Sequence, residues 1–278
     1  KSINVKGDVT STGDITGGGT LNFNGSGEQT FTPNNMSYPA VTTTSDGSLT
    51  ISGDLNAVSV NTTCTTYIAD SIITTGNQTY SGAVELNGDT SLNAPLIQFS
   101  SAVDGPYTLT TNGTLQINNT VNVGTLAATT ANIKGDITTS IGGQTYSGPV
   151  TLQKNAALTA PPGQLVKFES TLSGAYSLQI SDADSQFDGA VNIASLITAN
   201  ADINSSSITT TGSQVYNGAV TLSQNNTTFK GTSLTFAASV ASSSAGSGRT
   251  ITFDRCTAVD NSSASVSADI SYLFDRTS

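Results

Sequence analysis

The side chains that could do chemistry in this chain are few, and most of them are carboxylates. Histidine is absent from the 278 residues, so neither a Ser-His-Asp nor a Cys-His constellation can form. The two cysteines, Cys64 and Cys256, are too few to supply a zinc site of the usual kind or a disulfide framework. We therefore expect no catalytic residue, no cofactor and no enzymatic activity.

The nearest approach to a paired-carboxylate site is Asp182 with Asp184, in the segment SDADS. In a strand the two side chains would share a face, and in a turn they could hold a calcium ion, so they are weak calcium candidates. Asp8 and Asp14 form a second acidic spot, which lacks the register of calcium-binding nonapeptide repeats. We favour the simpler interpretation, that both pairs lie in solvated turns.

One motif returns along the chain and organises it. It reads GNQTYSGAVEL at residues 76–86, GGQTYSGPVTL at 142–152 and GSQVYNGAVTL at 212–222, and a truncated copy, EQTF, stands at 28–31. A chain that copies itself is built from repeated structural units. The glutamines of the full copies lie 66 and 70 residues apart, and the matching apolar positions are Tyr80, Val84 and Leu86; Tyr146, Val150 and Leu152; Tyr216, Val220 and Leu222.

The tyrosines of this motif allow two interpretations. Because Tyr80, Tyr146 and Tyr216 recur at one position, they could form an exposed aromatic ladder that stacks on glycans. A repeated aromatic residue is more often a filler of the core or of a corner. We expect the second arrangement, with the tyrosine near a corner and the following Val and Leu facing inward.

Short strands separated by turns are expected throughout the chain. Apolar residues alternate with Thr and Ser in triplets such as Leu49-Thr50-Ile51, which is typical of a strand with one buried face. We predict an all-β fold, a right-handed parallel β-helix (β-solenoid) with three coils of roughly 22 residues in each repeat. An array of small β-sandwich modules is the alternative, although modules of this size without Trp, disulfides or linkers would bury little surface.

Three regions are predicted along the chain. Residues 1–48 hold a partial repeat and an irregular protruding loop from Pro33 to Ser48, where two prolines and an Asn pair interrupt the pattern. Residues 49–236 form the repeat body. Residues 237–278 form a C-terminal coil, cap or assembly segment, which begins with a low-complexity loop at Ser239–Ser247.

The composition excludes two classes of partner. Charged residues make up 10 % of the chain, the net charge is −10, and only nine residues are Lys or Arg, so the chain is not expected to bind nucleic acid. No apolar run approaches the ~20 residues of a membrane span, so no membrane insertion is expected. The opening residues, KSINV, do not have the pattern of a signal peptide, and we expect a mature form or a piece of a longer protein.

The repeats resemble those of a known family. The combination TTG-x-QTY-x-GAVTL, followed by V-x-G-x-Y-x-L and VN-x-x-x-L-x-T, is similar to repeats of large filamentous-haemagglutinin-like adhesins. Bacteria secrete these proteins by two-partner or autotransporter routes. The similarity extends from Leu49 to Phe253, and it implies a right-handed parallel β-helix that serves as a stalk or adhesive shaft.

These observations together predict a structural or adhesive role. We expect a β-solenoid segment of a secreted bacterial cell-surface protein, acting outside the cell as a stalk, adhesin shaft or filament subunit. The expected partners are other copies of the chain, in end-to-end or lateral assembly, or glycans of a host or surface. The alternative function is that of a polysaccharide-binding or polysaccharide-degrading β-helix protein.

Overall fold

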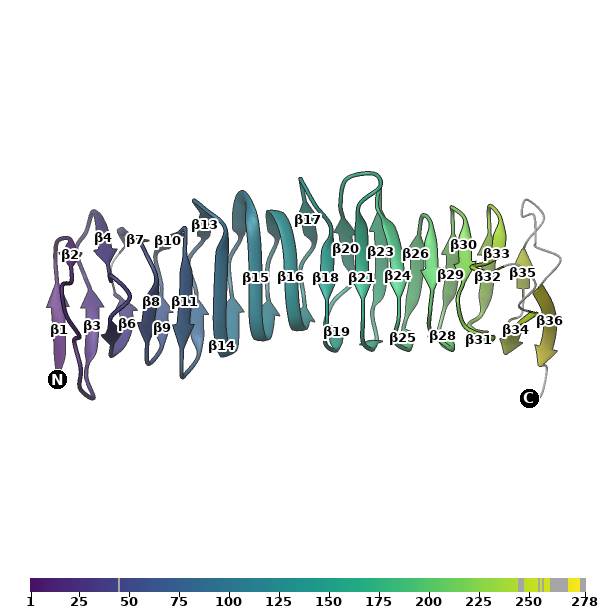
Figure 1. Cartoon of the computed structure of the whole chain (residues 1–278), viewed down its shortest axis with the longest axis horizontal. Coiled ribbons are helices and arrows are strands. Elements are labelled where there is room, and N and C mark those ends of the chain that lie inside the picture. Colours follow the sequence, from purple (N-terminus) through teal and green to yellow (C-terminus); the bar gives the residue numbers. More distant parts are fainter. Residues whose placement is uncertain (45, 245–247, 255, 257, 261–269, 276–278) are drawn as a thin grey trace. The chain divides into compact units, whose positions relative to one another are not determined.

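The computed structural model describes residues 1–44, 46–244, 248–254, 256, 258–260 and 270–275. Over these residues the regular secondary structure consists of strands alone, so none of them belongs to a helix long and apolar enough to cross a membrane. The chain divides into two compact units, Lys1–Ile141 and Gly142–Ser278. Figure 1 shows that within each unit the strands stand side by side, coil after coil.

Unit 1 is a parallel β-solenoid whose coils each pass through three faces. Within each face, strands of successive coils pair in parallel. The short strands of the first face are β1 (Ser2–Val5), β3 (Thr20–Phe23), β6 (Ala40–Thr43), β9 (Val60–Thr62) and β12 (Gln78–Tyr80). Those of the second face are β2 (Val9–Thr10), β4 (Glu28–Thr32), β7 (Ser48–Ile51), β10 (Thr65–Ile68), β13 (Val84–Leu86) and β17 (Ile137–Thr139). Those of the third face are β5 (Ser37–Tyr38), β8 (Leu55–Ala57) and β11 (Ser71–Thr74).

Three longer strands of unit 1 continue around the corners and so belong to more than one face. They are β14 (Thr90–Phe99), β15 (Val103–Ile117) and β16 (Val121–Ile133). Their register shifts at the corners, for example between Asn93 and Leu96, where the chain passes from the third face to the first. The shift lets the chain bend without ending the strand, because a bulge locally increases twist and bending.

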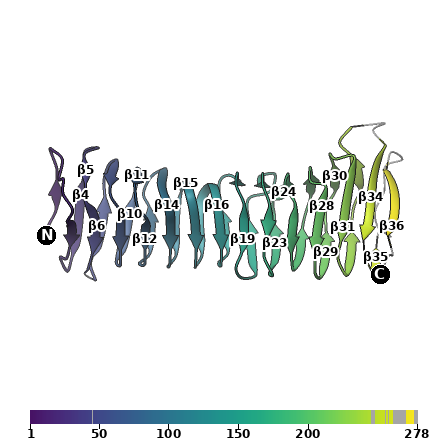
Figure 2. The ribbon, with the colours of Figure 1, turned by 90° about the horizontal axis from the view of Figure 1, so that it is seen from below.

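Unit 2 has the same architecture. Its first face holds β18 (Gln144–Tyr146), β21 (Leu165–Phe168), β24 (Asp184–Phe187), β27 (Ala201–Ile203), β30 (Val220–Leu222) and β33 (Val240–Ser242). The second face holds β19 (Val150–Leu152), β22 (Leu172–Ser173), β25 (Val191–Ile193), β28 (Ser207–Thr210), β31 (Asn226–Lys230), β34 (Arg249–Asp254) and β36 (Ile270–Asp275). The third face holds β20 (Ala156–Thr159), β23 (Ser177–Ser181), β26 (Ser195–Thr198), β29 (Ser213–Tyr216), β32 (Ser233–Phe236) and β35 (Ala258–Asp260). Figure 2 shows these stacks turned by 90°.

The core follows from the alternation of apolar and polar residues along each strand. In β7, Leu49 and Ile51 are 1 % and 0 % exposed, whereas Ser48 and Thr50 lie half-buried on the outside. Successive side chains of a strand point to opposite sides, and a coil can cover its inward Val, Leu and Ile only with the neighbouring coils. The predicted all-β parallel solenoid is therefore confirmed. The sandwich alternative is excluded, because the described strand pairs are parallel.

One sequence repeat was expected to span three whole coils, and in unit 2 it does not. The register of unit 2 carries Gln144 to Val166, then to Ser185 and to Ala201 in three coils. Gln214, the next copy of the motif glutamine, lies two strands further along the chain, in β29 on the third face. The expectation was wrong because coil length varies with the turns, from 22 residues between Gln144 and Val166 to 16 between Ser185 and Ala201.

The segment predicted as a protruding loop is mostly part of the stack. Pro33–Met36 forms an irregular turn, in which Asn34 and Asn35 have φ of 54° and 55°. Asn tolerates this left-handed region better than most residues. The rest of the segment was predicted wrongly, because β5 and β6 lie within it and pair with β8 and with β3.

The C-terminal region also contains strands where a loop was expected. In the segment Ser239–Ser247, residues 240–242 form β33, which pairs with β30, and residues 245–247 lie outside the described residues. β36 pairs in parallel with β34, so the described part of this region continues the second face. The predicted regional boundaries after residues 48 and 236 divide the chain by repeat content, and they stay predictions.

Candidate functional site

The repeated motif places a glutamine and a tyrosine inside the solenoid. Gln78 and Tyr80 are both 0 % exposed, and because they are two residues apart on one strand they point to the same side. The Tyr80 hydroxyl donates to Gln78 Oε1 at 3.0 Å. The same buried bond joins Tyr146 to Gln144 at 2.9 Å, and Tyr216 to Gln214 at 3.0 Å. These three pairs form the Gln-x-Tyr clamp.

The amide nitrogen of the clamp glutamine ties neighbouring coils together. Gln214 Nε2 donates to Ile208 O at 3.1 Å and to Lys230 O at 2.9 Å. These carbonyls belong to β28 and β31, which are adjacent strands of the second face. Gln78 Nε2 likewise donates to Ile72 O and to Asn93 O. A buried polar group of this kind has to be hydrogen-bonded, or its desolvation costs stability.

The truncated copy of the motif satisfies its glutamine in another way. Phe31 stands where the full copies have tyrosine, so no hydroxyl reaches Gln29. Gln29 Oε1 instead accepts the backbone N–H of Gly25 at 2.8 Å, and Gln29 Nε2 donates to the carbonyls of Val5 and Gly7. The backbone N–H of Gly25 thus takes the place of the missing tyrosine hydroxyl as donor to Gln29 Oε1.

The tyrosines of the motif are not available to a ligand. All three are 0 % exposed, and burial raises the pKa of Tyr80, Tyr146 and Tyr216 well above the ordinary value. They do not form an exposed aromatic ladder. Their rings stack inside the core, as Tyr146 does on Phe168 with ring centroids 5.2 Å apart. The valines and leucines expected to face inward are also buried: Val84, Leu86, Val150, Leu152, Val220 and Leu222.

Exposed repeated tyrosines exist at a different position, which the sequence analysis missed. Tyr107 and Tyr176 are 38 % and 40 % exposed. Each follows a glycine with positive φ by two residues, Gly105 with φ 139° and Gly174 with φ 131°. The repeated pattern Gly-x-Tyr was a signal for them, because a glycine of this conformation turns the chain outward at a corner.

The acidic residues near the N-terminus accept backbone hydrogen bonds. Asp8 Oδ1 accepts the N–H of Thr30 at 2.7 Å, and Asp14 Oδ1 accepts that of Ser37 at 2.8 Å. In both cases the donor lies on the next coil, and Asp89 accepts the N–H of Thr108 in the same way. Each of these carboxylates supplies an acceptor to a strand of the following coil, where a backbone N–H would otherwise lack a partner.

The two weak calcium candidates lie in different local structures. Asp182 is an exposed turn residue with φ 64°, whereas Asp184 begins β24. Asp184 Oδ1 accepts Asn200 Nδ2 at 2.8 Å. Within the part of the chain that the structure describes, no three His, Cys, Asp or Glu side chains are grouped so that they could hold a metal ion.

A cluster of polar side chains lies on the outside of the first face of unit 2. Two neighbouring strands, β24 and β27, alternate carboxylates and amides, and the register places Gln186 opposite Asp202. Each carboxylate therefore has an amide beside it on its own strand or on the next. The six residues of this polar tile are Asp184 and Gln186 on β24 with Asp188 directly after it, and Asp202 on β27 with Asn200 and Asn204 directly before and after it.

Hydrogen bonds hold the polar tile in place. Asp188 Oδ1 accepts both Gln186 Nε2 and Asn204 Nδ2 at 2.7 Å. Asn200, besides donating to Asp184, accepts the N–H of Ala219 at 2.8 Å. Such bonds hold the side-chain amides of Gln186, Asn200 and Asn204 in fixed orientations.

The aspartates of the polar tile differ in their electrostatic surroundings. Lys167 Nζ lies 2.8 Å from Glu169 Oε1 and 3.4 Å from Asp188 Oδ2. Burial acts to raise the pKa of Asp188, but the hydrogen bonds from Gln186 and Asn204 and the charge of Lys167 outweigh it, so this pKa lies below its usual value. Burial, together with the negative charge of Asp188, raises the pKa of Asp202 above its usual value.

A hollow of about 330 Å³ lies over the polar tile. It is lined by Asp184, Gln186, Asn200 and Asp202 of the tile, by Leu165 from the preceding coil, and by Ala219 and Thr221 from the following coil. The alternation in DSQFD and NADIN was a signal in the sequence, but the register that joins the two segments was not readable. The hollow offers donors and acceptors to a hydroxyl-rich ligand.

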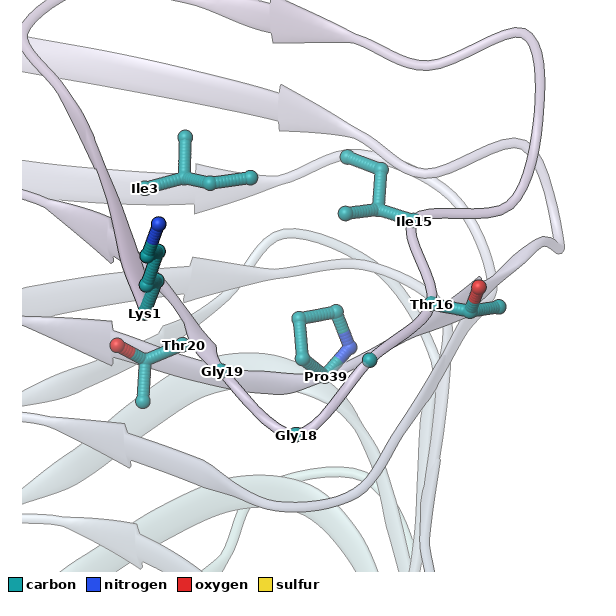
Figure 3. A pocket seen from close by; sticks show the side chains of 9 residues that line it. Lys1, Ile3, Ile15, Thr16, Gly18, Gly19, Thr20 and Pro39 are labelled. Atoms are coloured by element: carbon teal, nitrogen blue, oxygen red, sulfur yellow. The ribbon is translucent and has the colours of Figure 1, made fainter.

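Two hollows in unit 1 have a different character. Figure 3 shows the first, where Ile3 and Ile15 lie on the same side of Gly18 and Gly19, with Lys1 near Ile3. The second is more apolar, and it is lined by Tyr38, Val58 and Ile73 among others. Val58 and Ile73 are 53 % and 46 % exposed.

The cysteines do not form a bridge. Cys64 is buried and Cys256 is half-buried, and both thiols are free. Burial raises the pKa of the Cys256 thiol, which lowers the fraction of reactive thiolate. Comparison of the chain with models of protein families, with curated proteins and with solved structures finds no match.

Proposed function

We propose that this chain is a structural and adhesive β-solenoid segment of a secreted bacterial cell-surface protein. The observation that carries the proposal is the Gln-x-Tyr clamp. The buried glutamines of the clamp form hydrogen bonds to neighbouring coils, as Gln214 does to β28 and β31. Cross-linked coils resist bending and unravelling, which is what a stalk or shaft requires.

The outer surface supports the same proposal. It is rich in Ser, Thr and Asn and carries few charges, with 10 % charged residues in the chain. Ion pairs join Lys167 to Glu169 and to Asp188, and Lys230 to Asp254. A polar surface of low charge density stays soluble outside the cell without attracting nucleic acid.

Surface labelling tests the location, and adhesion assays test the role. Antibodies against the chain are expected to label intact producing cells, and deletion of the segment is expected to reduce attachment of those cells to host cells or abiotic surfaces. Labelling that appears only after lysis would overturn the extracellular assignment. Unchanged attachment of the deletion strain would overturn the adhesive role.

Self-association is the partner that the architecture suits best within this proposal. Parallel strands at the end of a stack carry unpaired backbone groups that another copy can pair with. Electron microscopy at high protein concentration is expected to reveal filaments or lateral bundles. Monodisperse single particles at every concentration would overturn self-assembly and leave the stalk role intact.

A second candidate function, polysaccharide binding, is favoured by the hollow over the polar tile. Asp184, Asn200 and Asp202 present hydrogen-bonding groups with fixed geometry in a concave surface. Among the described residues, Lys167 is the cation that pairs with a carboxylate of the tile, so the hollow keeps a negative balance that suits neutral glycans and disfavours sulfated or uronic ones.

A glycan array with matched variants tests this candidate. The substitutions Asp184→Ala and Asp202→Ala are expected to abolish binding of neutral glycans, while Asp182→Ala, in the exposed turn beside the hollow, leaves it unchanged. A screen for cleavage of the bound glycans, with and without calcium, separates binding from degradation. Equal glycan binding by the wild type and both tile variants would overturn the assignment of this hollow.

A further inference from the structure

Four Asn-Gly dipeptides occur in the chain, and they share one intrinsic reactivity. They begin at Asn24, Asn87, Asn112 and Asn217. In such a dipeptide the glycine nitrogen can attack the Asn side-chain carbonyl carbon, because glycine has no Cβ to hinder the approach. The attack requires that the glycine N–H lose its proton, so a hydrogen bond that holds this N–H in place slows the reaction.

Three of the four glycine nitrogens are held by hydrogen bonds. Gly25 N donates at 2.8 Å to Oε1 of Gln29, the glutamine of the truncated motif copy. Gly113 N donates to Thr129 Oγ1 at 2.9 Å, and Thr129 Oγ1 donates back to Gly113 O at 2.7 Å. Gly218 N donates to the carbonyl of Ala199 at 3.0 Å.

The fourth glycine nitrogen differs. The hydrogen bonds found among the described residues include none from Gly88 N, although the preceding N–H, of Asn87, donates to Ile68 O at 2.8 Å. Asn87 is exposed and lies with Gly88 in the turn between β13 and β14. Its side chain makes no hydrogen bond to the described chain, so it is free to rotate toward Gly88 N.

We propose that Asn87 is the site of a spontaneous covalent modification, deamidation through a cyclic imide. Gly88 N loses its proton to hydroxide and bonds to Asn87 Cγ, the Cγ–Nδ2 bond breaks, and ammonia leaves with the proton it needs. Water then adds to either imide carbonyl and opens the ring. Attack at Cγ yields aspartate, and attack at the backbone carbon yields isoaspartate.

The product changes the corner of unit 1 at which it forms. Both outcomes add a negative charge two residues from Asp89, whose carboxylate accepts the N–H of Thr108 on the next coil. Like charges so close disfavour each other. The isoaspartate form also lengthens the main chain in a turn whose length sets the register of β14 against β11. The modification therefore loosens one corner and leaves the remaining coils paired.

Peptide mapping by mass spectrometry of the folded chain, aged at mildly alkaline pH, tests the proposal. Asn87 is expected to convert roughly tenfold faster than Asn112 and Asn217, the factor that corresponds to ~1.4 kcal/mol, near the upper range for one hydrogen bond. The chain unfolded in denaturant provides the reference, in which the four sites should react at similar rates. Equal rates at Asn87 and Asn112 in the folded chain would overturn the proposal.

One substitution converts a protected site into a reactive one. Thr129→Val keeps the shape of the side chain and removes the oxygen that holds Gly113 N, so conversion at Asn112 is expected to rise toward that at Asn87. Asn87→Gln, whose side chain would have to form a larger ring, is expected to remove the fast phase. A Thr129→Val chain that folds and leaves Asn112 as slow as before would contradict the protective role of the hydrogen bond. The ratio of rates in the wild type remains decisive where this variant does not fold.

Discussion

The hydroxyl of Tyr146 donates to Gln144 Oε1 at 2.9 Å, two residues along the same strand and wholly out of contact with solvent. The bond satisfies a polar atom that no water reaches, and it leaves Gln144 Nε2 free to donate to Thr159 O at 3.0 Å. The motif thus places two polar side chains in an apolar core and lets them hydrogen-bond to each other. Its recurrence in each full copy reflects a structural requirement of the coil.

Removal of the hydroxyl should therefore destabilise the chain. Tyr146→Phe leaves Gln144 Oε1 buried without its donor, and we expect a loss of about 1–3 kcal/mol in the free energy of unfolding. Urea denaturation measures the loss, with Tyr107→Phe as the control because Tyr107 is exposed. Equal stability of wild type and Tyr146→Phe would show that the hydroxyl contributes nothing.

The double substitution Tyr146→Phe with Gln144→Met sharpens this test. Replacing both partners of a buried hydrogen bond by apolar groups can be nearly neutral, whereas removing one leaves an unsatisfied atom. We expect the double variant to be more stable than Tyr146→Phe alone, although it also loses the bond to Thr159. A purely additive result in the double-mutant cycle would contradict a coupled clamp.

A second prediction concerns a corner where only glycine fits. Gly113 has φ 122°, and a Cβ on it would lie 1.8 Å from Ala94 O. Gly113→Ala is expected to cost at least ~1 kcal/mol from the backbone conformation alone, and more from the clash with the neighbouring coil. Gly27→Ala is the matched control in the same unit, because Gly27 has open space around its Cα. Thermal unfolding of both variants measures the contrast, and similar losses in the two would refute it.

The third prediction separates strand capping from calcium binding at the N-terminal acidic spot. Asp8→Ala removes the acceptor for the Thr30 N–H and is expected to cost about 1 kcal/mol, whereas Asp8→Asn keeps an acceptor oxygen and costs less. Calcium is expected to leave the unfolding temperature unchanged, since the Asp8 carboxylate already has a partner. A rise of this temperature with calcium that Asp8→Asn abolishes would instead assign a metal to this spot.

The sequence predicts what each strand buries better than it predicts which face a residue occupies. The inward direction of Val150 and Leu152 follows from alternation alone, because a strand has a period of two. The face that carries Gln214 depends on how many residues each turn takes, and turns that differ by several residues satisfy the same backbone hydrogen bonds. The polar tile was missed for this reason, since Asp184 and Asn200 become neighbours only when the length of one coil is known.

The register also explains why the motif does not mark one face. Gln144 and Gln214 accept the same hydrogen bond from the tyrosine two residues along, although they lie on different faces of unit 2. The clamp needs a strand that carries the glutamine and the tyrosine, and carbonyl groups of two successive coils beyond the nearest corner. Both unit 2 faces on which the clamp occurs provide them. A sequence repeat that is not a whole number of coils is therefore tolerated, because the interactions that it encodes are local to one coil and its neighbours.

The last prediction uses two carboxylates of the polar tile whose pKa values move in opposite directions. The pKa of Asp188 is lowered, so its ionised form stabilises the fold above the pKa of the unfolded chain, near 3.9, and this stabilisation is lost as the pH falls through the folded pKa. The pKa of Asp202 is raised, so its protonated carboxyl stabilises the fold. This stabilisation is present at pH values below the pKa of the unfolded chain, and it is lost as the pH rises through the pKa of the folded chain. At neutral pH, ionised Asp188 supports folding and ionised Asp202 opposes it.

Single substitutions should therefore change stability with opposite signs at neutral pH. Asp188→Asn is expected to destabilise the chain at pH ~7, and Asp202→Asn to stabilise it, while both differences from the wild type shrink in acid, where aspartates are protonated. Urea denaturation at neutral and acidic pH measures both. Because the Asp188 charge contributes to the raised pKa of Asp202, the gain from Asp202→Asn should be smaller in the Asp188→Asn background. A destabilising Asp202→Asn at neutral pH would mean that hydrogen bonds to this carboxylate, such as that from Ser223, outweigh the cost of burying its charge.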